Sequence, residues 1–582
     1  MNPEHVESGG SSPGSRASSS PARKAKNGVY SGQGVVSQEV INGEVVEHIR
    51  GIETTAGTKL ERRLEARHIS MIAMGGAIGT GLLLGSGKAL EQGGPASIFI
   101  SFSLVGIIVW LVMTALGEIC TWLPMSAGFT GYATRFCDPS LGFALGWTYY
   151  LKYALQPAQQ LTSAALVIQF WLPADRVNPG VWIAILLVII IGINYFGVRL
   201  FGEVEFYLSA FKVIVMIGVI LVTLIIAAGG ADGHPRGFEY YRNPGAFAPY
   251  LEKGSLGKFA GFWSTLVTAV FAFLGTELVG VTGAEAANPR RSIPRAMKLT
   301  FFRIAFFYIA SIFLVGLCVP YNSQQLAFAN KATANANASP FVVAMRLAHI
   351  QVLPHILNAA ILVFVFSAAN SDVYIATRTL YGLASVGDAP AIFRRTDKRG
   401  VPVNALAVSA VVGLIGFLNV STASKNVFTY LINVVTILGL LAWISILITH
   451  ISFVRARRAQ GVTDKQMPYV APFGLWGSSV ALFVCILICI TKNFDALVPN
   501  IYSQAKYSEF ITGYIGIPVY LGLLFGHKLI TKSKRVKAHE CDLFTGKDII
   551  DREEEEYIAR EESEKAASGP QSFYKRWVSW LF

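Results

Sequence analysis

The sequence predicts an all-α polytopic membrane protein. Of its 582 residues, 53% are hydrophobic and only 15% are charged, whereas an ordinary soluble protein has about 25% charged residues. The mean hydropathy is +0.47, and apolar runs long enough to cross a bilayer recur along most of the chain. A string of water-soluble domains is therefore excluded, because a chain this apolar would not stay in solution.

Apolar runs predict twelve transmembrane helices, since each run has about the 20 mostly apolar residues that a helix needs to span the hydrocarbon core. An even number of passes places both termini on one side. The tails and the short loops on that side hold most of the Lys and Arg residues behind the net charge of +13, which predicts cytoplasmic termini. The runs are 69–90, 96–118, 142–171, 181–199, 204–229, 260–286, 299–320, 352–380, 403–420, 427–453, 473–491 and 513–531.

Glycines interrupt the first and the sixth of these runs. Gly79-Thr80-Gly81 and Gly275-Thr276-Glu277 occupy matching places, five spans apart. Such a pair of interrupted segments indicates an inverted-repeat transporter with its site near the bilayer midplane. Glycines that only allow close helix packing are the alternative for either span alone, but packing does not explain the matching positions.

A broken helix predicts a particular kind of ligand. The break frees N–H groups at one half-helix end and C=O groups at the other, and a zwitterionic amino acid carries a carboxylate and an ammonium that match them. We expect Gly79, Thr80 and Gly81 to hold the carboxylate. The amino group would meet carbonyls near Ala77, Phe271 and Leu274, with Gly275 beside them. Phe271 and Phe273 are candidate gate residues, although phenylalanines in a membrane more often only pack.

Several long motifs resemble the yeast amino-acid transporter family of fungal permeases, within the amino acid–polyamine–organocation superfamily. They are RHISMIAMGGAIGTGLLLGSGKAL, GFTGYATRFCDPSLGFALGW, FLGTELVGVTGAEAANPRRSIPRA, SAANSDVYIATRTLYGLA and DKRGVP. The resemblance implies a LeuT-like fold with a 5+5 inverted repeat, discontinuous helices 1 and 6 and two extra C-terminal helices. It also implies proton-coupled uptake at the plasma membrane and a substrate site lined by Gly79–Gly81 and Phe271–Glu277.

The resemblance divides the chain into six predicted segments. Two are polar cytoplasmic tails, the N-terminal one being rich in Ser, Gly and charge and therefore disordered. The segments are the N-terminal tail 1–66, the first repeat 67–229, an extracellular loop 230–259, the second repeat 260–454, the last two helices 455–531 and the C-terminal tail 532–582.

Lys152, in the third predicted span, is the residue expected to select the substrate. A lysine within a span is costly and by default functional, although it could instead snorkel to the interface. Family members typically carry a Glu where this chain has Gln160, so we expect Lys152 to be a fixed cation with no acid at position 160 to neutralise it. The natural ligand is then aspartate or glutamate, as in the dicarboxylic amino-acid permease branch. Thr436 could add a hydrogen bond, or could equally hold two helices together.

Four residues are candidates for proton coupling. Glu277 is the leading proton carrier, because burial favours a neutral carboxyl. Lys212 resembles the fifth-span lysine that replaces a sodium ion in superfamily members without sodium dependence, and the alternative is a purely structural tie. Glu118 and Asp372 are weaker candidates that could instead cap a helix or pair with a loop arginine. Importing glutamate with one proton gains nothing from the membrane potential, so more than one titrating group is expected.

Other classes of function fit less well. The first alternative is a permease for neutral or many amino acids, with Lys152 turned away from the site. The second is a non-transporting amino-acid receptor, which the short tails disfavour. An enzyme is not expected, since no catalytic motif is present.

The expected partners are an amino acid, protons and the lipid bilayer. Lys24 and Lys26, with the serines near them, could serve ubiquitin ligases and arrestins, although such tail charges are usually just solvated. Scattered cysteines and the charge pattern predict no metal, no cofactor and no nucleic acid.

Overall fold

A computed structural model describes residues 36–41, 44–49, 79–125, 128–231, 233–278, 289–330, 339–420, 424–497 and 504–568. The predicted roles of Lys24, Lys26 and Ala77 therefore lie outside the described residues. The chain forms two units, Met1–Arg50 and Gly51–Phe582.

The first unit contains a β-hairpin. Strands β1 (Val36–Ile41) and β2 (Glu44–Ile49) pair antiparallel, with Val36 opposite Ile49. The prediction of a disordered tail did not include it. The sequence does carry a signal for the hairpin, since Asn42-Gly43 separates the two strands and this dipeptide favours tight hairpin turns.

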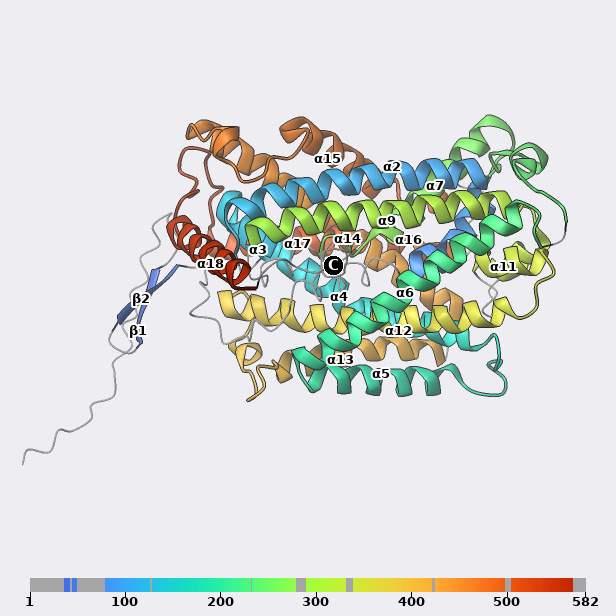
Figure 1. The fold of residues 1–582 in the computed structure, drawn as a ribbon, viewed down its shortest axis with the longest axis horizontal. Coiled ribbons are helices and arrows are strands. Elements are labelled where there is room, and N and C mark those ends of the chain that lie inside the picture. Colours follow the sequence, from blue (N-terminus) through green and yellow to red (C-terminus); the bar gives the residue numbers. More distant parts are fainter. Residues whose placement is uncertain are drawn as a thin grey trace, which may run out of the picture. The chain divides into compact units, whose positions relative to one another are not determined.

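The described part of the second unit is helical, and most of its long helices run along a common direction (Figure 1). Its elements are η1 (Gly81–Gly85), α2 (Ser86–Trp122), α3 (Gly128–Phe136), α4 (Pro139–Ile168), α5 (Pro179–Tyr195), α6 (Val198–Ala227), η2 (Tyr241–Gly245), α7 (Gly254–Phe273), α9 (Pro289–Cys318), α10 (Gln324–Asn330), α11 (Pro340–Leu347), α12 (Leu353–Val386), η4 (Ala391–Arg394), α13 (Val403–Gly413), η5 (Leu414–Val420), α14 (Ser424–Ala459), η6 (Asp464–Gln466), α15 (Gly474–Thr491), η7 (Phe494–Leu497), α16 (Gln504–Tyr514), α17 (Gly516–Thr531) and α18 (Lys547–Ser568).

Eight helical stretches among the described residues are long and apolar enough to cross a membrane. One of them, Gly81–Trp122, covers parts of two predicted passes. Its helix changes direction at Gly94, which is followed by Pro95. The φ of Gly94 is +82°, a conformation that suits glycine. The polytopic all-α class is confirmed, whereas the count of twelve passes stays a prediction. Helix α4 is not one of the eight, and its middle carries Lys152, Gln156, Gln159 and Gln160.

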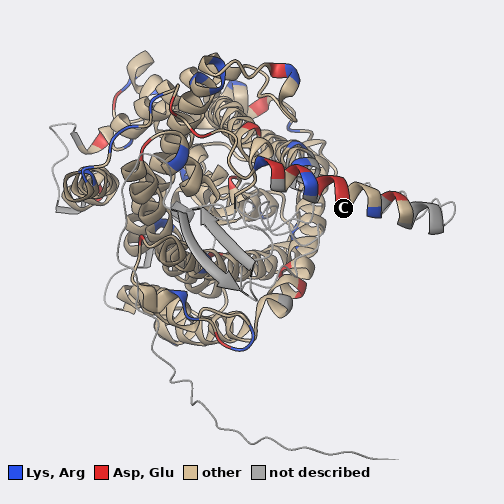
Figure 2. Ribbon diagram, turned by 90° about the vertical axis from the view of Figure 1, so that its left-hand side faces the viewer, with Lys and Arg blue, Asp and Glu red and all other residues tan. Residues whose placement is uncertain are grey.

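Apolar side chains on the outer helices remain exposed, which suits contact with lipid tails. Examples are Val188 on α5, Ile214 on α6, Phe483 on α15 and Leu529 on α17. Charged residues are sparse along the bundle and frequent on the helix that leads to the C-terminus (Figure 2). This distribution agrees with a bundle that is solvated by lipid and a C-terminal helix that is solvated by water.

Two groups of helices pack closely within the bundle. Helix α2 packs most extensively on α7 and α9, whereas α4 packs most extensively on α12 and α14. The predicted first and sixth passes belong to the first group, and the third pass, with Lys152, belongs to the second. A site between them would therefore be formed by both groups.

The C-terminal segment is bound to one end of the bundle. The indole of Trp122, at the end of α2, donates to the carbonyl of Leu543 at 2.8 Å. Arg290, at the start of α9, forms ion pairs with Asp551 and Glu554. Arg135 of α3 forms an ion pair with Asp542, and the carbonyl of Cys137, directly after α3, accepts from the amide of Val536. Gln460, directly after α14, donates to the carbonyl of Cys541.

Candidate substrate site at the broken helix

The sixth predicted pass is broken where the sequence predicts it. Helix α7 ends at Phe273, and Leu274 then adopts an extended backbone with φ −61° and ψ 140°. Gly275 has φ +100°, a conformation that residues with a side chain rarely adopt. The chain continues through a turn to Glu277, and residues 279–288 lie outside the described part. The predicted discontinuity of this helix is therefore confirmed.

The described part of the first pass lies against this break. Its helix begins with a π-helical turn, η1, a feature that is frequent at functional sites. A Cβ on Gly81 would come within 2.5 Å of the Cα of Ala272, so only glycine lets the two backbones approach this closely. Thr80 accepts a hydrogen bond from Gln159 of α4 at 3.3 Å, and a Cβ on Gly79 would lie 3.9 Å from the Nε2 of Gln160. Both predicted broken segments thus meet each other and α4.

Lys152 reaches the break from α4. Its Nζ lies 2.5 Å from Oε1 of Glu277, and both side chains are fully buried. The implied expectation that Lys152 has no neutralising acid is therefore wrong. Glu277, 125 residues further along the chain than Lys152, provides the negative charge that Gln160 cannot provide. Only the tertiary structure brings the two together, and the pairing meets the rule that a buried charge needs a partner.

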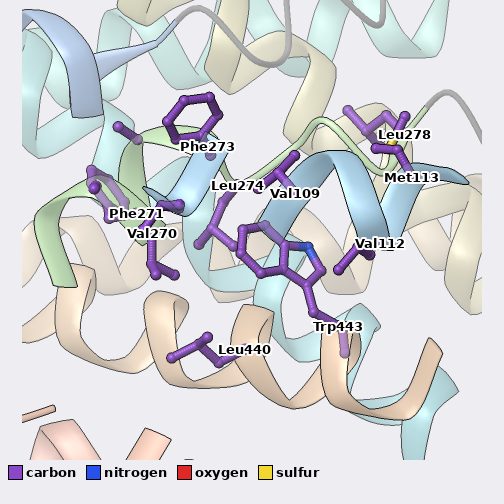
Figure 3. Close-up of a cluster of buried hydrophobic side chains, with 14 of the residues drawn as sticks. Val109, Val112, Met113, Val270, Phe271, Phe273, Leu274, Leu278, Leu440 and Trp443 are labelled. Carbon is purple, nitrogen blue, oxygen red and sulfur yellow. The ribbon is translucent and has the colours of Figure 1, made fainter. Parts of the chain in front are cut away.

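Aromatic side chains enclose this ion pair. The ammonium of Lys152 lies 4.4 Å from the ring centre of Tyr153 and 5.4 Å from that of Tyr149, within the range of cation–π attraction. The other oxygen of Glu277 accepts from the indole of Trp443 at 3.2 Å and from the amide of Gly275 at 3.0 Å. Trp443 extends from α14 toward the segment that carries Leu274 (Figure 3). Glu277 therefore has donors from α4, from α14 and from the break itself.

The proposed gate residues lie beside the break, and their gating role stays a prediction. Phe273 is fully buried and stacks on Tyr308 with ring centres 4.6 Å apart. Phe271 keeps 7% of its surface exposed. Leu274 packs closely on α14, because a Cβ on Gly439 would come within 2.4 Å of it. Figure 3 shows these three side chains around the end of α7.

Three buried side-chain oxygens on the helix that carries Lys152 have no hydrogen-bond partner among the described residues. They belong to Gln156, Gln159 and Gln160 of α4. A buried acceptor without a partner is costly, and most such groups in folded proteins are bonded to protein or water. These oxygens can accept hydrogen bonds from an ammonium group. Helix α4 therefore carries both acceptors for an amino group and a lysine that can bind a carboxylate.

The other predicted site residues have different surroundings. Thr436 donates to the carbonyl of Ile432 within its own helix, and its role in substrate binding stays a prediction. Lys212 is fully buried near Glu205 and Asp372, and its role in proton coupling stays a prediction. Glu118 belongs to another cluster. It accepts from His450 at 3.1 Å and from the amide of Ala471 at 2.9 Å.

Sequence reasoning missed four residues around this region. Tyr149, Tyr153 and Trp443 carried no signal beyond their place in apolar runs. Glu205 did carry a signal, since it precedes Lys212 by seven residues, which places both on one face of a helix.

Comparison with known proteins shows which family this chain resembles. The profile of the amino acid permease family matches residues 68–540. The dicarboxylic amino acid permease of Saccharomyces cerevisiae is 49% identical over 533 residues, covering 90% of this chain and 87% of that protein. The proline-specific permease of Emericella nidulans is 37% identical, covering 94% and 96%. The lysine-specific permease of Saccharomyces cerevisiae is 38% identical, covering 87% and 81%.

Solved structures show the same fold at low sequence identity. The manganese transporter of Eremococcus coleocola, in complex with an aromatic bis-isothiourea compound, superposes with a TM-score of 0.50 at 12% identity, over 82% of this chain and 99% of that one. Together with the broken helix, this likeness confirms the LeuT-like class. The family consists of transporters and not of enzymes. The chain therefore belongs to the amino acid permease family.

Proposed function

We propose that this permease imports acidic amino acids together with protons across the plasma membrane, with both termini in the cytoplasm. The observation that carries the proposal is the buried ion pair of Lys152 and Glu277 at the helix break. The similarity to the dicarboxylic amino acid permease supports the same substrate class. The substrate's α-carboxylate would bind at Gly79–Gly81, and its amino group at the carbonyls near Phe271 and Leu274.

The ion pair suggests how substrate and proton are coupled. A substrate side-chain carboxylate that reaches Lys152 competes with Glu277 for the same ammonium. Glu277 then loses its counter-charge, and a buried carboxylate without a counter-charge is unfavourable. Binding a proton removes that charge. One acidic substrate and one proton would therefore enter the site together, and Glu277 carries the proton only while substrate holds Lys152.

A second candidate function rests on the same ion pair. If Lys152 and Glu277 stay paired when substrate is bound, the site has no net charge from these two residues. A neutral amino acid then fits better than an acidic one. This version is a neutral or general amino-acid permease, and it predicts no exchange of partners at Lys152.

Uptake of labelled glutamate, leucine and lysine by cells that express the chain separates the two candidates. We expect glutamate to be taken up in preference to leucine and lysine, and Lys152→Ser to abolish the uptake of glutamate. Lys492→Ser is the matched control, since Lys492 is also a buried lysine but donates to the carbonyl of Asn433. Uptake of leucine with no uptake of glutamate by the unmodified protein would establish the second candidate instead.

A further inference from the structure

A cluster of buried charges, separate from the pair of Lys152 and Glu277, lies between α6 and α12. Glu205 and Lys212 of α6 and Asp372 of α12 have at most 2% of their surface exposed. Lys212 interacts electrostatically with both Glu205 and Asp372. Three ionisable side chains in the interior of a membrane protein are expensive, and by default such residues are functional.

The hydrogen bonds of this group leave room for a proton. Oε1 of Glu205 accepts from Ser367 of α12 at 2.7 Å and from Ser209 at 3.3 Å. Oε2 of Glu205 and Oδ2 of Asp372 have no hydrogen-bond partner among the residues that the structure describes. Each carboxyl therefore has one oxygen that can take a proton without breaking an existing hydrogen bond.

Charge counting shows why a proton is needed. Lys152 and Glu277 compensate each other. Lys212 is then left with two acids, so the five residues together carry one excess negative charge when all are ionised. An uncompensated charge at this depth is costly, and two neighbouring carboxylates resist ionising together. One proton on either carboxyl brings the total to zero.

The charges that face this group come from three elements. Helix α6 provides Glu205 and Lys212, α12 provides Asp372, and α4 provides Lys152 with the phenols of Tyr149 and Tyr153. Because Asp372 interacts electrostatically with both lysines, the charge of this group is sensed at the substrate site. An anionic substrate would be repelled less after the group has taken up a proton.

We propose that Glu205 and Asp372, together with Lys212, form a proton-binding site that holds one exchangeable proton shared by the two carboxyls. This inference rests on the proposed function and adds to it a proton that is separate from any on Glu277. The step is simple, since a carboxylate takes up one proton from the side to which the site is open and returns it on the other side. Two protons per glutamate would also let the membrane potential contribute to uptake.

The test measures how many protons enter with each substrate molecule. Purified protein is reconstituted into liposomes, and glutamate uptake is recorded together with internal acidification by a pH-sensitive dye. We expect about two protons per glutamate for the unmodified protein. Glu205→Gln and Asp372→Asn are each expected to lower the ratio by one and to flatten the dependence of KM on external pH. Both variants should still exchange internal for external glutamate.

Two further variants control for structural damage. Glu203→Gln removes a carboxyl from a half-buried position two residues away on the same helix and should leave the ratio unchanged. Glu205→Asp keeps the carboxyl and should keep the proton. The proposal therefore requires that the second proton per glutamate is lost in Glu205→Gln and retained in Glu205→Asp.

The outcomes distinguish this inference from the proposed function. No proton movement in the unmodified protein would overturn proton coupling itself, and this inference with it. Proton movement with an unchanged ratio in both Glu205→Gln and Asp372→Asn would overturn only the proton site between α6 and α12. If another amino acid proves to be the substrate, the same ratio is measured with that amino acid.

Discussion

Glu118 and Glu277 are both fully buried carboxylates, but their surroundings differ in kind. Glu118 lies in the part of helix α2 that follows the change of direction at Gly94, and its partners are His450, Arg457 and the amide of Ala471. Glu277 lies directly after a broken helix, and two of its donors are Lys152 of another helix group and the amide of Gly275 in the break itself. A carboxylate held by fixed helices stabilises one arrangement, whereas one held by a break can exchange partners when the break rearranges.

The comparison also separates two predictions about Glu118. The sequence left open whether it carries a proton or pairs with an arginine. Its ion pair with Arg457, at 3.2 Å, agrees with the second possibility. Proton transport by Glu118 remains an untested prediction.

The largest expected effect comes from breaking the pair at the helix break. Lys152→Met leaves Glu277 buried without a counter-charge, and breaking a buried ion pair typically costs about 3–5 kcal/mol. We expect glutamate uptake to fall by at least about 100-fold and the amount of protein at the membrane to fall as well. The measurement is uptake per transporter, with surface labelling to count the transporters.

The double variant Lys152→Met/Glu277→Gln sharpens this result. Removing both charges should restore the amount of protein, because neither residue of the pair then leaves the other as an uncompensated buried charge. Glutamate uptake should stay lost if Lys152 binds the substrate. Recovered glutamate uptake would show that the pair only stabilises the fold.

The next effect concerns the close approach of the two broken helices. Gly81→Ala places a methyl group within 2.5 Å of the Cα of Ala272, so a backbone must move. Overpacking of this kind costs about 1–3 kcal/mol, and we expect a tenfold or greater loss of uptake. Gly382→Ala on α12 is the matched control, because a Cβ there meets nothing within 4 Å. Equal losses in the two variants would contradict a special role for the contact at Gly81.

Glu118→Gln tests the other side of the comparison. The amide can still accept from Ala471 but no longer neutralises Arg457, so the protein should be less stable. We expect a moderate loss of protein at the membrane and an unchanged preference among glutamate, leucine and lysine in the transporters that remain. A changed proton-to-substrate ratio in this variant would instead make Glu118 a proton carrier.

The smallest effect is expected at the C-terminal segment, where ion pairs are partly exposed. Arg290 pairs with the partly exposed Asp551 and Glu554, and the two pairs together should contribute about 1 kcal/mol. Arg290→Gln should therefore increase cleavage of α18 by a protease by about twofold to fivefold. Undiminished protection would show that the contacts of Trp122 and Arg135 are sufficient to hold the segment.

The same segment predicts a pH dependence. Burial raises the pKa of Asp551, but hydrogen bonds from Lys547 and Arg290 outweigh burial, and the pKa lies below its ordinary value. Because the pKa of Asp551 is lowered when α18 is bound to the bundle, its carboxylate stabilises the bound α18 at every pH above the ordinary pKa of an aspartate. This contribution is lost as the pH falls through the lowered pKa. Protection of α18 should hence be constant between about pH 8 and 5 and decrease only below about pH 4. A decrease near neutral pH would contradict this assignment.

Composition and the spacing of glycines were enough to predict the class of the protein and the position of a helix break. Lipid imposes a minimum apolar length on each pass, and Gly275 marks the break because its positive φ excludes other residues. The hairpin of residues 36–49 was missed, although Asn42-Gly43 signals it, because the composition around it is typical of disorder. Local signals of this kind can be read directly from the chain, since each depends on a few neighbouring residues.

The charge of the site was beyond such reasoning. The sequence showed that Lys152, Lys212, Glu277 and Asp372 are unusual residues for a membrane interior, but it could not show which of them face each other. Glu205 was missed. Pairing depends on the contact of α4 with the break and of α6 with α12, and these contacts join residues far apart in the chain. Because electrostatic interactions in a low dielectric depend on separations of a few ångströms, only the tertiary structure decides which charges cancel and which carboxyl is left to bind a proton.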